Sequence, residues 1–249
     1  VRSMQDYLSP LVRAIPPSGI RRFFDLVSAS KDIISLGVGE PDFVTPWHVR
    51  EASVYALEQG RTTYTHNAGL PELREEIAAY LHNRFQLNYN PADEMIVTVG
   101  GSEAIDLALR ALISPGDEVL IPEPTYIPYS PIASICGAKA VGIETFARDR
   151  FKLTAEGLRE KLTPRSKILI LCYPSNPTGA IMSYEDYLPI ARLVEEHDLI
   201  VISDEIYAEL TYGANHVSFA SLPGMKDRTI VVSGFSKAFA MTGWRMGYA

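Results

Sequence analysis

The sequence predicts a three-layer α/β/α fold with a mostly parallel sheet, and two observations carry this prediction. First, five short runs rich in Val, Ile or Leu show little polar alternation, which is typical of strands covered on both faces. These runs are residues 95–99, 118–121, 167–172, 199–203 and 229–233. Second, segments with helical spacing of apolar residues alternate with these runs, so we expect helices on both faces of the sheet.

Several helix starts can be placed from the sequence. Thr45 is expected to be the N-cap of a helix whose first turn contains Pro46. Apolar residues recur at helical spacing after Pro71 and again across residues 105–112. Ser183 and Asp186 have the spacing of a capping box, so a further helix is expected to begin there.

The composition narrows the functional classes. The chain has 249 residues, and 47% of them are hydrophobic, which is enough for a sizeable core. The net charge of −7 argues against nucleic acid as a partner, because proteins that bind polyanions are usually basic. No apolar run approaches the roughly 20 residues of a membrane-spanning helix, so no membrane partner is expected. The two cysteines do not predict a disulfide framework, which favours a cytoplasmic location.

Polar residues and glycines follow each predicted strand, at the edge of the sheet where α/β proteins bind their ligands. In order of the strands they are Gly101 and Ser102, then Tyr126, then Asn176, then Asp204 and Tyr207, and finally Ser236, Lys237 and Arg245. Each has an ordinary structural explanation by itself, such as a turn, a packing aromatic, a helix cap or a surface charge. The functional prediction depends on their occurring together at successive strand ends.

The combined set matches the requirements of one cofactor, pyridoxal 5′-phosphate (PLP). This cofactor needs a lysine amine for a Schiff base and a carboxylate at its pyridine nitrogen. A phenol and an amide can bond the ring oxygen, and an aromatic side chain can stack on the ring. A helix N-terminus together with an arginine can bind the phosphate. The sequence offers each of these groups, and it predicts no metal site.

Four segments also resemble a known family. Residues 36–43, 173–179, 203–207 and 233–247 resemble the motifs of class I aminotransferases, which have PLP fold type I. The motifs occur in the family's order and extend over essentially the whole chain. The similarity is greatest to bacterial aromatic and aspartate aminotransferases and to enzymes of the "aminotransferase A" kind. The resemblance implies an enzyme of amino-acid metabolism, a PLP-dependent transaminase.

The resemblance also implies a role for each residue at the strand ends. Lys237, Asp204 and Tyr207 would be catalytic. Lys237 would form the Schiff base and move a proton, Asp204 would pair with the pyridine nitrogen, and Tyr207 would bond the ring oxygen. The other cofactor contacts would come from Asn176 at the ring oxygen, Tyr126 on the ring face, and Gly101, Ser102, Ser236 and Arg245 at the phosphate.

Two further residues take roles from the resemblance alone. Tyr64 would reach the phosphate of the neighbouring subunit, which implies a homodimer with shared active sites. Gly39 would offer its backbone to the substrate carboxylate, with Asn176 as the second substrate contact. The substrates implied are small molecules, an amino acid and a 2-oxo acid.

The sequence departs from the family pattern in two places. Position 234 is glycine where some relatives have a phosphate-binding serine, so Ser236 is expected to do more of that work. The sequence stops at Ala249, whereas family members continue further. We therefore expect residues 1–45 to belong with a small domain and residues 46–249 to form the PLP-binding large domain. The rest of the small domain, including the arginine for the substrate carboxylate, is expected to lie outside this sequence.

Several reactions remain open on this fold, because they share the same lysine and aspartate. Transamination from an L-amino acid to 2-oxoglutarate is the leading hypothesis. A carbon–sulfur β-lyase, a decarboxylase, an acyl-transfer synthase and a non-catalytic PLP-binding sensor are the alternatives. Some relatives that prefer dicarboxylates have a basic residue after the Gly-Gly turn. Ser102 at this position favours an aromatic or other neutral amino donor.

Overall fold

The computed structural model describes residues 4–17, 37 and 39–249, and the chain divides into two units, Val1–Asp42 and Phe43–Ala249. In the first unit, η1 (Met4–Tyr7) precedes the short helix α1 (Pro10–Arg13). Ser9 caps α1, because its hydroxyl accepts a hydrogen bond from the Val12 amide at 3.3 Å. Part of the motif at residues 36–43 lies outside the described residues, and the assignment of residues 1–45 to a small domain stays a prediction.

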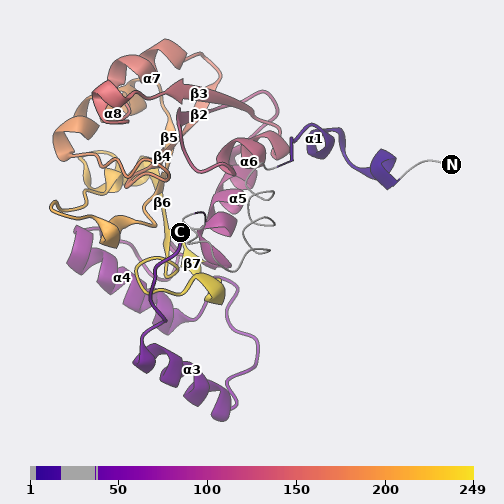
Figure 1. The fold of residues 1–249 in the computed structure, drawn as a ribbon, viewed down its shortest axis with the longest axis vertical. Coiled ribbons are helices and arrows are strands. Elements are labelled where there is room, and N and C mark those ends of the chain that lie inside the picture. The colour runs from indigo at the N-terminus through magenta and orange to yellow at the C-terminus, as the bar shows by residue number, and fades with distance from the viewer. Residues whose placement is uncertain (1–3, 18–36, 38) are drawn as a thin grey trace, which may run out of the picture. The chain divides into compact units, whose positions relative to one another are not determined.

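Within residues 43–249, all of which the structure describes, seven strands form one sheet in the order β1-β7-β6-β5-β4-β2-β3 (Figure 1). The strands are β1 (Val97–Thr98), β2 (Glu118–Glu123), β3 (Lys139–Glu144), β4 (Ser166–Cys172), β5 (Ile200–Asp204), β6 (Thr229–Gly234) and β7 (Gly247–Tyr248). The pairs from β3 through β2, β4 and β5 to β6 are all parallel, and only β7 runs antiparallel to its neighbours β6 and β1. The prediction of a mostly parallel sheet is confirmed.

Two strands have no counterpart among the predicted runs. β3 interrupts its apolar residues with Lys139 and Gly142, and β7 has only two residues, so neither gives the pattern of a buried strand. The predicted run at 95–99 shortens to β1, which pairs only with β7 and stands at the edge of the sheet.

Two helices of this unit precede the first strand, and four lie between later strands, in the alternation that the sequence predicts. They are α3 (Trp47–Glu58), α4 (Pro71–Phe85), α5 (Gly100–Leu112), α6 (Tyr129–Ile135), α7 (Ala155–Lys161) and α8 (Tyr184–Glu196). Short 3₁₀ turns follow at η2 (Ala147–Asp149), η3 (Ala208–Leu210), η4 (Phe219–Ser221), η5 (Lys226–Arg228) and η6 (Thr242–Trp244). The capping box of α8 is confirmed: the Ser183 hydroxyl accepts from the Asp186 amide at 3.2 Å, and Asp186 Oδ2 accepts from the Ser183 amide at 2.8 Å.

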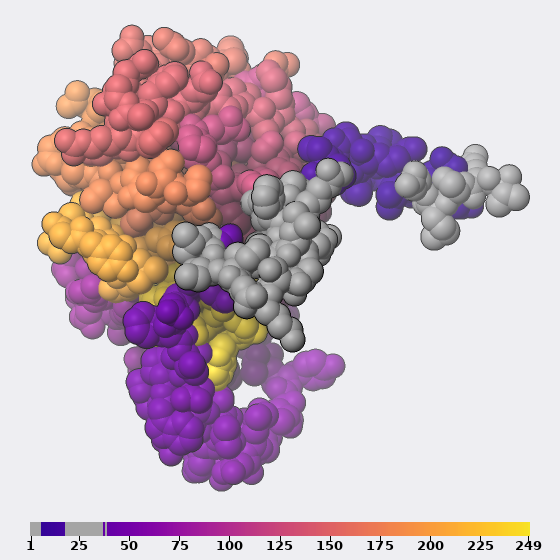
Figure 2. Space-filling view, viewed as in Figure 1, coloured from indigo at the N-terminus to yellow at the C-terminus, as the bar shows by residue number. Residues whose placement is uncertain are grey.

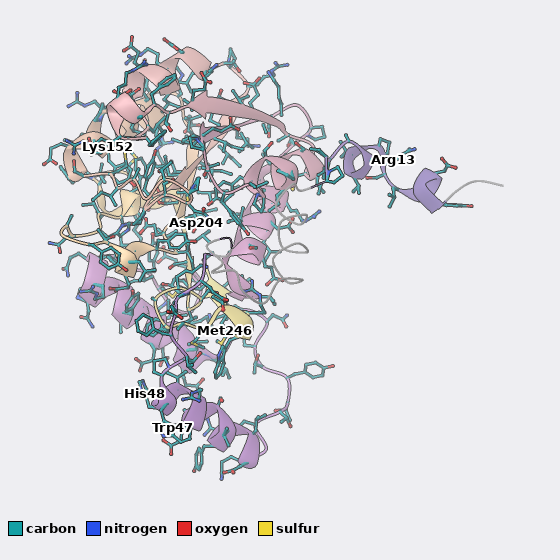
Figure 3. The ribbon with its side chains drawn as sticks, viewed as in Figure 1. Arg13, Trp47, His48, Lys152, Asp204 and Met246 are labelled. Carbon is teal, nitrogen blue, oxygen red and sulfur yellow. The ribbon has the colours of Figure 1, made fainter. Side chains whose placement is uncertain are left out.

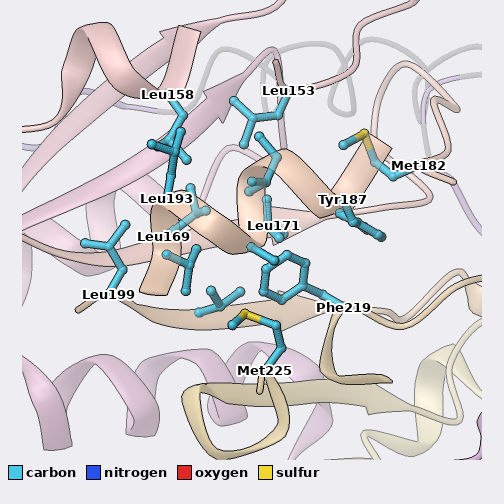
Figure 4. Close-up of a cluster of buried hydrophobic side chains, with 14 of the residues drawn as sticks. Leu153, Leu158, Leu169, Leu171, Met182, Tyr187, Leu193, Leu199, Phe219 and Met225 are labelled. Atoms are coloured by element: carbon cyan, nitrogen blue, oxygen red, sulfur yellow. The ribbon is translucent and has the colours of Figure 1, made fainter. Parts of the chain in front are cut away.

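Both faces of the sheet are buried, and β4 shows this residue by residue. Leu169 and Leu171 pack on one face, in a cluster with α7 and α8 (Figure 4). Ile168 and Ile170, which alternate with them, pack on the other face with α5 and α6. Because successive side chains of a strand point to opposite faces, a strand that is apolar throughout must be covered twice. This confirms the three-layer fold.

The predicted role of Thr45 is wrong. The N-cap of α3 is Pro46, and no side chain bonds the first turn of this helix. Thr45 is instead buried, and its hydroxyl contacts the backbone of Ala240 and the indole of Trp244, almost 200 residues later in the chain. The hydroxyl that the local pattern assigns to the helix start is used instead in a tertiary contact, which a local pattern cannot predict.

Helix α3 buries none of its residues in this unit. Figure 2 shows it standing out from the rest of residues 43–249 at the bottom of the view, and Figure 3 labels Trp47 and His48 on it. Trp47, Val54, Tyr55 and Leu57 are all more than half exposed. An apolar helix surface of this kind usually packs against a partner. Among the described helices, none is long and apolar enough to cross a bilayer.

Candidate active site

The carboxyl ends of the central strands bring the predicted residues into one region. Cys172 at the end of β4 pairs in register with Asp204 at the end of β5, and Asp204 pairs with Val232 of β6. Asn176 and Lys237 follow the ends of β4 and β6 within a few residues. The parallel register therefore places Asp204 between the strand ends that these two loops follow, and Figure 3 labels Asp204 near the centre of the view.

Asp204 is a buried carboxylate with two hydrogen-bond donors. It is only 7% exposed, and its Oδ2 accepts a hydrogen bond from the Tyr129 hydroxyl at 2.6 Å. Its Oδ1 accepts from the Ile206 amide at 3.2 Å. Burial raises the pKa of Asp204 above its ordinary value, and the two hydrogen bonds oppose this shift only in part. The site thus holds a carboxylate that a nearby cation would stabilise in its ionised form.

Lys237 and Asn176 both lie near Tyr207, whose pKa is in turn affected by the nearby Asp204 carboxylate. The Lys237 amine lies 5.6 Å from the centre of the Tyr207 ring. Burial raises the pKa of Tyr207 to about 12, and the neighbouring Asn176 side chain opposes this shift in part. Tyr207 therefore keeps its proton at neutral pH and can donate a hydrogen bond. The structure brings these three predicted residues together.

Tyr126 and Ser102 form a second contact at the strand ends. The Tyr126 hydroxyl and Ser102 Oγ lie 3.5 Å apart, and the Tyr126 ring meets the Tyr129 ring edge to face at 5.4 Å. Tyr126 thus connects the first turn of α5 with α6, next to the residue that holds Asp204. Its predicted position against a cofactor ring stays a prediction.

Arg245 lies against the N-terminus of α5. A Cβ at Gly100 would lie 2.3 Å from Arg245 Nη2, so only glycine leaves room for the guanidinium there. Arg245 Nη1 donates to the Thr242 carbonyl at 2.9 Å, which fixes the direction of the side chain. Within the ranges that the structure describes, Arg245 makes no ion pair with a carboxylate. A guanidinium and the free amides of a helix start together form a site for an anion.

The backbone explains the glycine at position 234. A Cβ on Gly234 would lie 2.8 Å from the Met246 carbonyl oxygen and 2.9 Å from the Gly247 Cα. A serine here would force β6 and β7 apart, because both neighbours are backbone atoms. Ser236, two residues later, is buried on the same loop. Its role at a phosphate remains a prediction.

Two predicted site residues are not brought to the strand ends. Tyr64 lies in the connection between α3 and α4, and its side chain is fully exposed. Gly39 belongs to the first unit, which the structure does not place relative to the strand ends. The roles of Tyr64 and Gly39 therefore stay predictions.

Two buried residues beside Asp204 were not predicted from the sequence. Tyr129 follows Tyr126 by three residues at the start of α6, and this spacing was the available signal that both rings face the same region. Glu205, directly after Asp204, is buried as well. It accepts from Ser203 Oγ at 2.9 Å and Ser218 Oγ at 2.7 Å, and lies 2.8 Å from His216 Nε2. Glu205 is thus a carboxylate with its hydrogen bonds satisfied, whereas Asp204 makes no ion pair within the described part of the chain.

Comparisons with known proteins agree with this geometry. The model of the family "Aminotransferase class I and II" matches residues 31–249. The chain belongs to this family. The Bacillus subtilis protein YugH is 56% identical over 246 residues, which cover 99% of this chain and 64% of YugH.

Solved structures of family members superpose closely. The aspartate aminotransferase from Thermus thermophilus with maleate has a TM-score of 0.91 at 41% identity, covering 97% of this chain and 63% of that one. The aromatic aminotransferase from Pyrococcus horikoshii OT3 has a TM-score of 0.86 at 46% identity, covering 92% and 61%. The chain therefore spans less than two thirds of the length of these relatives.

Class I aminotransferases use PLP, and the residues of this chain fit that group. The buried Asp204 carboxylate suits a protonated pyridine nitrogen, and Arg245 with the start of α5 suits a phosphate. Lys237 supplies an amine, which lies 5.6 Å from the centre of the Tyr207 ring. No cluster of three or more His, Cys, Asp or Glu side chains in the described residues is arranged to hold a metal ion.

Replacing Asp204 with Asn tests its charge separately from its shape. In the full-length protein we expect the variant to retain PLP through Arg245 and the start of α5. Its rate of amino-donor deprotonation should fall on the order of 10²-fold or more, as is typical when one preorganised electrostatic partner is lost. Asp204→Glu should recover part of the rate because the charge remains. Single-turnover measurements of the half-reaction provide the test.

In the PLP-free protein, Asp204→Asn should stabilise the fold, although the same substitution slows the reaction of the PLP-bound protein. Because burial raises the pKa of Asp204, its ionisation destabilises the folded state as pH rises above about 4, the usual Asp value. The PLP-free Asn variant should therefore unfold at a higher temperature than wild type at alkaline pH, and this difference should shrink as pH falls towards about 4. A less stable Asn variant with an unchanged half-reaction rate would make Asp204 only a turn cap.

Replacing Tyr129 with Phe leaves Asp204 with the Ile206 amide as its donor. We expect a further rise in the Asp204 pKa and a loss of about tenfold or more in half-reaction rate, since a hydrogen bond to a charged group contributes ~1.5–3 kcal/mol. Tyr80→Phe is the matched control, because the Tyr80 hydroxyl donates to Glu209 at 2.7 Å, away from Asp204. The half-reaction rate is measured as a function of pH for both variants, Tyr129→Phe and Tyr80→Phe. Equal rate losses in both variants would contradict the role of Tyr129.

Proposed function

We propose that the protein is a PLP-dependent aminotransferase that moves the amino group of an L-amino acid to 2-oxoglutarate. The observation that carries this proposal is the buried Asp204 carboxylate, held by Tyr129 beside Lys237 and Tyr207. A buried charge needs an opposite charge, and a protonated pyridine ring supplies one. Membership of the family supports the same reaction.

Each residue of the candidate site then has a defined task. PLP, when bound, accepts the electron pair that remains when a proton leaves the amino-acid α-carbon. Asp204 would hold a proton at the pyridine nitrogen. Lys237 Nζ would hold PLP covalently and, once the incoming amino donor has displaced it, would take up and return the α-proton. Tyr207 and Asn176 would donate hydrogen bonds to the ring oxygen. Water is kept from Asp204 by its burial, which strengthens its interaction with a cationic ring.

For the amino donor, we favour an aromatic or other neutral amino acid. Ser102 follows Gly101 at the start of α5, so no basic side chain stands at this position to bind a second carboxylate. The names of similar proteins include both aspartate and aromatic aminotransferases. Those names support amino-acid transamination in general, and the preference rests on Ser102.

A screen of amino donors tests the function and the preference together. The full-length protein is incubated with PLP, 2-oxoglutarate and single L-amino acids, and glutamate formation is measured. We expect glutamate from aromatic and neutral donors, and none from the Lys237→Ala variant, which lacks both the amine and the proton carrier. Release of pyruvate and ammonia from cystathionine without any 2-oxo acid would favour a β-lyase instead. Glutamate formation by Lys237→Ala at the wild-type rate would refute the site.

The protein is also proposed to act as a homodimer with two shared active sites. The exposed apolar residues of α3 and the fully exposed Tyr64 support a second copy as partner, because exposed apolar surface of this kind favours association.

Cys136 and Cys172 are free thiols, which supports a reducing compartment such as the cytoplasm.

Hybrid dimers test whether Tyr64 acts across the interface. A Tyr64→Phe subunit paired with a Lys237→Ala subunit would contain one intact site, if Tyr64 serves its neighbour, and one doubly damaged site. Mixing the two variants under subunit exchange should therefore restore activity above that of either parent. A mixture no more active than the average of its parents, or a fully active monomer in sedimentation, would refute the shared site.

A further inference from the structure

The turn that carries Lys237 and Arg245 contains two residues in a strained backbone conformation. Ala240 has φ 51° and Arg245 has φ 56°, both in the left-handed region. This region is unfavourable for residues other than glycine by ~1–2 kcal/mol each. Such residues persist only where surrounding contacts enforce them, and they gather at functional sites.

Thr45 provides such a contact from a distant part of the sequence. Its hydroxyl donates to the Ala240 carbonyl at 2.6 Å and accepts from Trp244 Nε1 at 3.1 Å. The hydroxyl therefore uses its donor and accepts one bond, both within the same turn. Thr45 is only 6% exposed, so water cannot readily replace either bond.

The backbone hydrogen bonds of the turn are local. The Met241 amide donates to the Ser236 carbonyl at 3.1 Å, and the Phe235 amide donates to the Met246 carbonyl at 3.1 Å. The Ala240 and Trp244 amides also bond carbonyls within the turn, at 3.5 Å and 3.2 Å. These bonds close the turn on itself without tying it to the rest of the unit, whereas Thr45 contacts it from a distant segment, between Lys237 and Arg245.

We propose that Thr45 is a positioning residue. Its hydroxyl holds the turn so that Lys237 faces Asp204 while Arg245 faces the start of α5. The inference rests on the proposed function of Lys237 and Arg245 as PLP residues. Thr45 itself touches no reacting atom. It fixes the distance between the amine that follows β6 and the guanidinium at Gly100. Loss of the hydroxyl should therefore show itself mainly as weaker PLP binding.

Thr45→Val and Thr45→Ser test this in the full-length protein. Val keeps the shape without the hydroxyl, and we expect the dissociation constant for PLP to rise about tenfold, the effect of losing ~1.4 kcal/mol of hydrogen bonding. Ser restores the hydroxyl and should stay within about threefold of wild type. Thr145→Val is the matched control, because the Thr145 hydroxyl donates to the Glu123 carbonyl at 2.8 Å, outside this turn. PLP is titrated into PLP-free protein well below its unfolding temperature, where a loss of stability alone cannot change the dissociation constant.

Two further readouts locate the effect. The fluorescence of Trp244 is obtained as the difference between the protein and its Trp244→Phe variant, and Thr45→Val should shift this signal while Thr145→Val does not. Ala240→Gly removes the strain that Thr45 opposes, so the effect of Thr45→Val on PLP binding should become smaller in that background.

The outcomes separate this inference from the proposed function. If wild type binds PLP and Lys237→Ala loses the covalent link, but Thr45→Val binds PLP as wild type does, the positioning role is refuted and the function stands. Strictly additive effects of Thr45→Val and Ala240→Gly would also refute it, since Thr45 would then act elsewhere. Wild-type protein that fails to bind PLP through Lys237 would refute the function itself.

Discussion

The candidate active site depends on a carboxylate buried at the end of a central strand. Asp204 ends β5, is shielded by layers on both faces of the sheet, and retains two hydrogen-bond donors. Those donors do not offset its burial, because its pKa stays raised. Because the core is apolar on both faces of β5, the ionised form of Asp204 is poorly solvated, and a cation at this edge of the sheet would stabilise it strongly. The same burial that builds the fold prepares the charge that the proposed reaction would use.

A second constraint is the close approach of three backbone segments. A Cβ on Gly247 would lie 2.4 Å from the Gly100 carbonyl carbon, and one on Gly234 would meet the backbone of Met246. Glycine at these positions lets β6, β7 and the start of α5 come together without side chains between them. Arg245 is thereby delivered to the helix N-terminus by its neighbours in the chain. The antiparallel β7, although only two residues long, is what returns the chain to this point.

The sequence predicts the parts of the site that follow strand ends and misses the parts that support them. Asp204 and Lys237 are predictable, because apolar strand runs locate the sheet edge and these residues follow directly. Tyr129 and Thr45 are not, since each acts through a tertiary contact with a residue 75 or 195 positions away. Local patterns such as the capping box of α8 succeed because the bonds lie within four residues. The pattern at Thr45 fails because a stronger long-range contact uses the same hydroxyl.

The arrangement also explains why one ligand should satisfy the whole site. At one end Asp204 is a buried anion, and at the other Arg245 and the start of α5 form a concentration of positive charge. Neither end has a partner of opposite charge in the described residues that fully balances it. A molecule with a cationic ring and an anionic phosphate, joined at a fixed distance, offsets both at once. Because such binding stabilises only the folded state, the charges that weaken the PLP-free protein become contributions to stability once the cofactor is bound. Under the proposed function, the separation of Asp204 and Arg245 would select the ligand, and this separation would depend on strand register and on the turn that Thr45 contacts.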